Sequence, residues 1–397
     1  QDEFQTSHCE TLFLQYTSGS TDLPRGVIVT HENVIHNSSI VLDLVGGECC
    51  GVSWLPFHHD MGLIGFYLFA IARGGVTHLI SPTDFLKRPR VWFETITETS
   101  ATVTSAPNFG YQYCLRKNKV PDEALNEFDL SSLRLMMNGA EPVDPATMES
   151  FADRFGPCGL NRDALVAIYG LAEHTLAVTS GGRRVFDPAA RAAPSVRGLC
   201  ASQTRQPIMS CGSPLPSVEV RIVDPNENAR LPDGRLGEIW LHGESVTNGY
   251  WGHNHQEANS LFAAGLHSEG NGTDKLYLRT GDLGFLLDGE LYITGRLKEV
   301  IQVRGRNIYP ADVESIARRV LDDSGRNPVA AFGSTPNGSG EEIIVLIENN
   351  GRDVDLSTVA RAIGEHLGVR PGVTALVPRG SLITTTSGKL ARNACRS

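Results

Sequence analysis

Thr11 to Gly26 reads TLFLQYTSGSTDLPRG, a strand-like run that passes directly into a loop rich in hydroxyl groups and glycine. The loop carries four hydroxyl side chains between Thr17 and Thr21, and Arg25 adds a forked cation. Hydroxyls, exposed backbone N–H groups and a guanidinium all hydrogen-bond to phosphate oxygens, so the stretch favours polyphosphate binding. It does not match the GxxxxGK[ST] pattern of Walker-type NTPases. The alternative, for the loop taken alone, is a flexible Ser/Gly turn.

After this loop, the pattern of apolar residues and turn signals changes twice along the chain. As far as about residue 179, β-branched runs alternate with helix-length segments, which predicts a largely parallel sheet covered by helices. Residues 181–206 are rich in Gly, Arg, Ala, Pro and Ser, and we interpret them as a probable insertion. Short strands separated by turn signals follow and indicate an antiparallel subdomain. The predicted fold is therefore α/β, with a large domain 1–296 and a small α+β domain 297–397.

The expected elements are short. In the first part we expect strands at 11–16, 51–55, 76–80, 101–105, 133–137 and 164–168. In the second part we expect strands at 218–223, 238–242, 275–279 and 290–294. In the small domain we expect strands at 300–303, 329–332, 343–348 and 374–377 and helices at 311–320 and 356–367.

Charge and cysteine usage exclude several classes of protein. With 35 Lys+Arg against 45 Asp+Glu the net charge is -10, which argues against a nucleic-acid partner. The 8 cysteines form no CxxC pair and no zinc spacing, so we expect reduced thiols in a cytoplasmic protein. No signal-like start and no run of 18 apolar residues is present, which disfavours secretion and a transmembrane segment.

Further short motifs follow the loop in order. They are NGAEP at 138–142, YGLAE at 169–173, LRTGDLG at 278–284, GRLKE at 295–299 and TSGK at 386–389. An aromatic face suits a nucleotide base, a carboxylate suits magnesium, and small residues allow the backbone to approach a base. Some of them have a plain alternative in isolation. LRTGDLG and GRLKE could be ordinary turns with a solvated charge, YGLAE could be a strand that ends in a tight turn before a helix N-terminus, and Lys389 could be a solvated lysine in a Gly-Ser loop.

Taken together, the series resembles adenylate-forming enzymes, the superfamily of acyl-CoA synthetases, luciferases and peptide-synthetase adenylation domains. Their phosphate loop usually reads TSGSTGxPKG. This chain has Asp22 in place of glycine and Arg25 in place of lysine, and an acid beside a triphosphate is electrostatically unfavourable. The resemblance also implies that the large domain here lacks the N-terminal part usual in the family.

The resemblance implies a role for each motif. Tyr169 would stack on adenine, Asp282 would accept the ribose hydroxyls, Glu173 would hold Mg²⁺, Lys298 would mark the hinge between the domains, and Lys389 would be the catalytic lysine. The implied ATP-binding residues are Thr17, Ser18, Gly19, Ser20, Thr21, Arg25, Gly139, Ala140, Glu141, Tyr169, Gly170, Asp282 and Arg296. ATP and Mg²⁺ are the implied cosubstrate and metal.

Three stretches resemble the fatty acyl-AMP ligase branch. They are WLPFHHDMGLIG at 54–65, YGLAEHTL at 169–176 and RGRNIYP at 304–310. This implies a fatty-acid substrate beside His59, Met61 and Gly62, and transfer of the acyl group to an acyl carrier protein. The branch also carries extra sequence near 181–206 that hampers the rotation needed for coenzyme A. Two alternatives stay open, an acyl-CoA synthetase and a non-catalytic module that binds acyl-adenylate.

Overall fold

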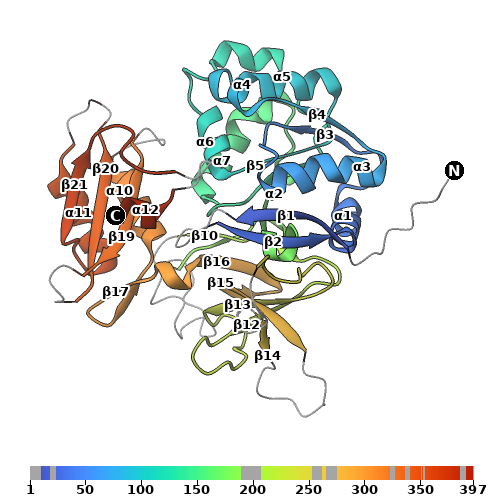
Figure 1. Ribbon diagram of the computed structural model, residues 1–397. Helices are drawn as coiled ribbons and strands as arrows, with labels where there is room; N and C mark the ends of the chain where they lie inside the picture. Colours follow the sequence, from blue (N-terminus) through green and yellow to red (C-terminus); the bar gives the residue numbers. More distant parts are fainter. Residues whose placement is uncertain are drawn as a thin grey trace.

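A seven-stranded mixed sheet forms the centre of the large part of the computed structural model, in the order β11-β8-β7-β6-β5-β3-β4 (Figure 1). The strands β4, β3, β5, β6 and β7 run parallel, and β8 and β11 are antiparallel additions at one edge. Their bounds are β3 Cys50–Ser53, β4 Val76–Leu79, β5 Val103–Ala106, β6 Leu135–Asn138, β7 Leu165–Gly170, β8 Ala177–Gly182 and β11 Ser213–Pro214. The predicted parallel sheet is confirmed.

The structure describes residues 10–17, 24–188, 207–252, 262–264, 275–321, 327–335, 340–349, 351, 354–384 and 390–396. Within these ranges, no helix has the length and apolar character needed to cross a membrane.

Helices such as α5 and α7 cover the parallel sheet because each buries an apolar face in its core. In α5, Trp92, Phe93 and Ile96 are fully buried, and Trp92 also donates from Nε1 to Thr104 Oγ1 at 2.8 Å. Trp54 stacks on Phe85 with 3.8 Å between ring centroids, so aromatic rings dominate this core. The helices are α1 His31–Val45, α2 Asp60–Gly62, α3 Phe69–Arg73, α4 Pro82–Lys87, α5 Arg90–Thr99, α6 Asn108–Cys114 and α7 Pro145–Phe155.

Antiparallel strands make up the rest of the large part. β1 and β2 form a hairpin, β9 pairs with β10, and a five-stranded sheet contains β12, β13, β14, β15 and β16. The bounds are β1 Thr11–Thr17, β2 Arg25–Thr30, β9 Val185–Phe186, β10 Ile208–Met209, β12 Glu219–Val223, β13 Gly237–His242, β14 Phe262–Ala264, β15 Leu276–Leu287 and β16 Glu290–Arg296. The antiparallel subdomain is confirmed.

The C-terminal elements have a core of their own. Their three-stranded sheet has the order β19-β20-β21, with β21 parallel to β20, and α10 and α11 contribute Ile316 and Ile363 to the shared core. In Figure 1 the elements β19, β20, β21, α10 and α11 lie together at the left, beside the rest of the molecule. The bounds are β17 Ile301–Val303, β18 Arg306–Ile308, α10 Pro310–Val320, β19 Val329–Ser334, β20 Glu342–Glu348, α11 Leu356–Leu367, β21 Val373–Val377 and α12 Arg392–Arg396. The exact boundary at 296/297 and the hinge stay predictions.

Three local features differ from the sequence prediction or add to it. The strand expected at 275–279 is longer than predicted, because β15 continues through the motif around Asp282 and pairs there with β16, which excludes the alternative of an ordinary turn. Of the stretch interpreted as an insertion, 181–206, residues 181–182 complete β8 and residues 185–186 form β9, while 189–206 lie outside the described residues, so the insertion stays a prediction. The segment after His59 begins as α2 and continues as a π-helical turn, Leu63–Leu68.

Candidate active site

The β1–β2 hairpin holds the two ends of the expected phosphate loop opposite one another. Thr17 ends β1 and pairs with Arg25, the first residue of β2. Residues 18–21 lie outside the described residues, so their roles stay predictions. The buried side chain of Gln15 donates to the carbonyl of His58 at 2.9 Å. The loop ends are thereby tied to the segment in which we expect the acyl channel.

The motifs at 138–141 and 169–173 meet because they follow adjacent parallel strands. β6 ends at Asn138 and β7 at Gly170, and the two strands pair in register. The carboxyl ends of parallel strands form one edge, which is where ligands bind in open α/β sheets. Glu141 reaches back along this edge and accepts from the backbone N–H of Phe109 at 2.5 Å.

Close packing around the backbone at this edge requires small residues. A Cβ at Gly170 would lie 1.9 Å from the carbonyl oxygen of Leu176, and one at Gly139 would lie 2.5 Å from Ile168 Cγ1. Ala140 has φ +69°, a conformation unusual for a residue with a side chain. Backbone held in such a conformation is common at ligand sites.

Tyr169, Asp282 and Arg296 form a hydrogen-bonded chain between the seven-stranded and the five-stranded sheet. The Tyr169 hydroxyl donates to Asp282 Oδ2 at 2.7 Å, and Arg296 Nε donates to Asp282 Oδ1 at 3.0 Å. Asp282 faces Arg296 because they are paired in register on β15 and β16. Burial, followed by the Asp282 carboxylate, raises the pKa of Tyr169, so its hydroxyl stays protonated as the donor.

Glu173 lies just beyond this chain, in a 3₁₀ turn that follows β7, and Tyr250 is its partner. The Tyr250 hydroxyl donates to Glu173 Oε1 at 2.6 Å. Burial raises the pKa of Glu173, and the Tyr250 hydrogen bond opposes that shift. Sequence reasoning missed Tyr250, although an aromatic pair, Tyr250-Trp251, close behind Gly249 was a visible signal.

The expected acyl-channel residues lie at the start of α2. His59 caps the helix, with Nδ1 accepting from the backbone N–H of Met61 at 3.2 Å. Met61 is buried, and Ser105 Oγ donates to its sulfur at 3.1 Å. Gly62 packs so closely that a Cβ would lie 2.5 Å from the carbonyl oxygen of Pro56. Their contact with an acyl chain stays a prediction.

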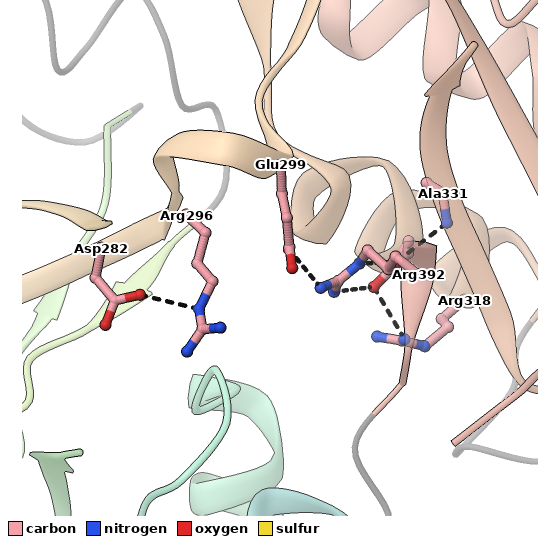
Figure 2. Close-up of polar contacts among 7 residues, drawn as sticks. Asp282, Arg296, Glu299, Arg318, Ala331 and Arg392 are labelled. Atoms are coloured by element: carbon pink, nitrogen blue, oxygen red, sulfur yellow. Dashed lines mark hydrogen bonds and ion pairs between the residues drawn. The ribbon is translucent and has the colours of Figure 1, made fainter. Parts of the chain in front are cut away.

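A cluster of buried ion pairs follows the predicted hinge. Lys298 lies in a 3₁₀ turn directly after Arg296, and the next residue, Glu299, accepts from Arg392 Nη1 at 2.9 Å. Arg392 also donates to Glu314 at 2.8 and 3.0 Å (Figure 2). Lys389 lies outside the described residues, three positions before Arg392. The sequence did not predict Arg392, because no motif distinguishes it from the other arginines of the chain.

The donor set fits a magnesium ion that arrives with a nucleotide. Among the described residues, no group of three or more His, Cys, Asp and Glu side chains could hold a metal ion alone. Mg²⁺ keeps several waters and is commonly bound through one or two carboxylates plus substrate phosphates. The single carboxylate of Glu173 near the phosphate-loop strand matches that mode better than a dedicated protein cage.

Comparison with known proteins places the whole chain among similar sequences. Residues 2–251 match the family model described as AMP-binding enzyme. The chain is 38% identical over 411 residues to a putative fatty-acid–CoA ligase, fadD21, of Mycobacterium leprae (strain TN), covering 97% of this chain and 69% of that protein. It is 36% identical over 403 residues to the medium-chain-fatty-acid–[acyl-carrier-protein] ligase JamA of Moorena producens (strain JHB), covering 97% of this chain and 67% of that protein.

A solved structure has the same fold. It comes from a study of fatty acyl-adenylate ligases of E. coli and L. pneumophila, and it superposes with a TM-score of 0.80 at 34% identity, covering 96% of this chain and 69% of that one. The names of the two relatives differ in the acceptor, coenzyme A in one and an acyl carrier protein in the other.

Proposed function

This chain belongs to the AMP-binding enzyme family and is an adenylate-forming fatty-acid ligase, and we propose that it uses ATP and Mg²⁺ to form acyl-AMP with release of pyrophosphate. The observation that carries the proposal is the chain Tyr169–Asp282–Arg296, which joins three separate motifs beside Glu173. The carboxylate and the guanidinium suit a ribose and a phosphate, respectively.

In the proposed reaction a fatty-acid carboxylate attacks the α-phosphorus of ATP, and the bond to the β,γ-pyrophosphate breaks. Both reactants are anionic, so the site must supply positive charge where the transition state concentrates it. Arg296 and Lys389 are the cations we assign to that task. Mg²⁺, held by Glu173, would neutralise phosphate charge when bound.

We assign the acyl carrier protein as the final acceptor, through its phosphopantetheine thiol. The support is the segment Arg304–Pro310 and the similarity to the acyl-carrier-protein ligase JamA. An acyl-CoA synthetase is the second candidate, and the 38% identity to a putative fatty-acid–CoA ligase favours it. The chemistry up to acyl-AMP is common to both.

One experiment decides between these candidates. The protein is incubated with ATP, Mg²⁺ and a panel of fatty acids, first alone, then with coenzyme A, then with a phosphopantetheinylated carrier protein. Two products together support the proposal: acyl-AMP with pyrophosphate in the first reaction, and a carrier protein that carries the fatty acyl group in the third. Efficient acyl-CoA formation in the second assigns the synthetase role, and no pyrophosphate in any reaction leaves only a binding module.

Asp282→Asn is expected to weaken AMP binding about ten- to a hundredfold, because a hydrogen bond to a charged group contributes about 1.5–3 kcal/mol. The contact exists both before and during chemistry, so the rate at saturating ATP should change much less. Calorimetric titration with AMP measures the effect. Asp224→Asn, in a turn of the antiparallel part, is the matched control. An unchanged AMP affinity in Asp282→Asn would remove the ribose contact from the proposal.

A further inference from the structure

Tyr250 lies between two residues to which the proposed function gives different tasks. Its hydroxyl donates to Glu173 Oε1 at 2.6 Å, while the guanidinium carbon of Arg25 lies 5.4 Å from the centre of its ring. Tyr250 is only 9% exposed, so the hydrogen bond and the cation–π contact are largely shielded from water.

Backbone contacts fix the segment around Tyr250 to both neighbours. Tyr250 forms an isolated antiparallel bridge with Val27 of β2, flanked by hydrogen bonds from Trp251 N to Gly26 O at 2.8 Å and from Ile28 N to Gly249 O at 2.9 Å. β2 is the strand by which the chain leaves the expected phosphate loop.

On the other side, the segment holds the turn that carries Glu173. The backbone N–H and the hydroxyl of Thr247 both donate to the carbonyl oxygen of Glu173, at 2.9 and 3.1 Å. The carbonyl and the carboxylate of Glu173 are thus bound by residues of one segment, 247–250. Because both the backbone carbonyl and the carboxylate of Glu173 are held, the side chain has few rotamers left, and its carboxylate is pre-organised.

We propose that Tyr250 is a positioning residue that orients the Glu173 carboxylate toward the metal of bound ATP and ties it to the phosphate-loop strand through β2 and Arg25. The inference rests on the proposed function, in which Glu173 holds Mg²⁺. Hydrogen-bond partners of a metal-binding carboxylate set its orientation, and losing one such partner lowers metal affinity. Tyr250 contacts neither substrate in this assignment and acts through Glu173.

The test measures ATP binding without fatty acid, so that no chemistry occurs. Calorimetry gives the dissociation constants of ATP in EDTA and of MgATP, and their ratio is the metal-dependent gain in affinity. Tyr250→Phe keeps the ring beneath Arg25 and removes only the hydroxyl. We expect it to reduce that gain about five- to tenfold while AMP affinity in EDTA stays within about twofold of the parent.

Tyr277→Phe is the matched control, because the Tyr277 hydroxyl donates to Glu219 at 2.7 Å away from the site. It should leave the gain unchanged. In a Glu173→Gln background, Tyr250→Phe should have little further effect, since interacting residues are non-additive.

Three results would overturn the inference. The metal-dependent gain in affinity could be the same in Tyr250→Phe as in the parent, or AMP affinity in EDTA could fall as much as the gain does. Tyr250→Phe could also reduce the gain in the Glu173→Gln background as much as it does in the parent. If the metal-dependent gain in Glu173→Gln equals that of the parent, the Glu173 carboxylate does not bind the metal, and the inference is overturned as well. The proposed function is judged separately, by acyl-AMP formation in the parent protein.

Discussion

Lys389→Ala is expected to lower the rate of acyl-AMP formation about 10²- to 10³-fold, since removing one group that stabilises transition-state charge costs about 2.7–4 kcal/mol. The reason is electrostatic. When a carboxylate attacks an α-phosphate, negative charge accumulates between two anions, and a positioned ammonium group stabilises that arrangement more than it stabilises bound ATP. Single-turnover measurement of acyl-AMP and pyrophosphate gives the rate of the step itself.

The matched control is Lys117→Ala, which removes a lysine that is 77% exposed and paired with Asp122 on the surface. It should leave the rate unchanged. AMP affinity should stay near the parental value in Lys389→Ala, because the nucleotide contacts we assign belong to Asp282 and Arg296. A parental rate in Lys389→Ala would exclude this lysine from the mechanism.

Where apolar periodicity and end signals agree, the sequence predicted the fold closely. Helix α11 was expected at 356–367 and has those bounds. Asp355 caps its first turn by accepting from the N–H groups of Ser357 and Thr358, and Gly368 ends it with φ +71°. An N-cap acid and a C-terminal glycine are local signals that the residue types themselves carry.

Strands were missed or predicted too short where the predicted site residues interrupt the alternating pattern. β15 was expected to end at Arg279, but it continues through Thr280-Gly281-Asp282 as far as Leu287. Pairing with β13 and β16 holds these glycine-rich residues extended, which local propensity does not indicate. The π-helical turn after α2 was likewise invisible, since it alters the helix register without a distinctive residue pattern.

The candidate site divides in the same way. Motifs readable from the sequence, around Tyr169 and Asp282, lie together in the structure. Tyr250 and Arg392 were not predicted because their contacts are tertiary, with a separation of 77 positions between Tyr250 and Glu173 and of 78 between Arg392 and Glu314. Spacing along the chain carries no signal for such pairs.

The Arg392 cluster leads to the second large effect. Arg392→Ala is expected to lower the free energy of unfolding of the C-terminal part by about 3–5 kcal/mol, because it removes the guanidinium that is shared by the two buried carboxylates of Glu299 and Glu314. The Glu314 side chain is 3% exposed and the Glu299 side chain is 11% exposed, so water can solvate neither carboxylate well. Urea titration followed by circular dichroism measures the change.

Arg318 provides the matched comparison on the same carboxylate. It reaches Glu314 at 3.5 Å from a side chain that is 38% exposed, and Figure 2 shows both arginines converging beside Ala331. Arg318→Ala should cost less, about 1 kcal/mol, because the Arg318 guanidinium is partly exposed and water screens its charge. Adding Glu314→Gln to Arg392→Ala should recover part of the loss, because a neutral amide can still accept from Ala331 N without a buried charge. If Arg392→Ala lowers the free energy of unfolding no more than Arg318→Ala does, the buried ion pairs of Arg392 do not stabilise the C-terminal part. Another positive charge must then compensate Glu299 and Glu314.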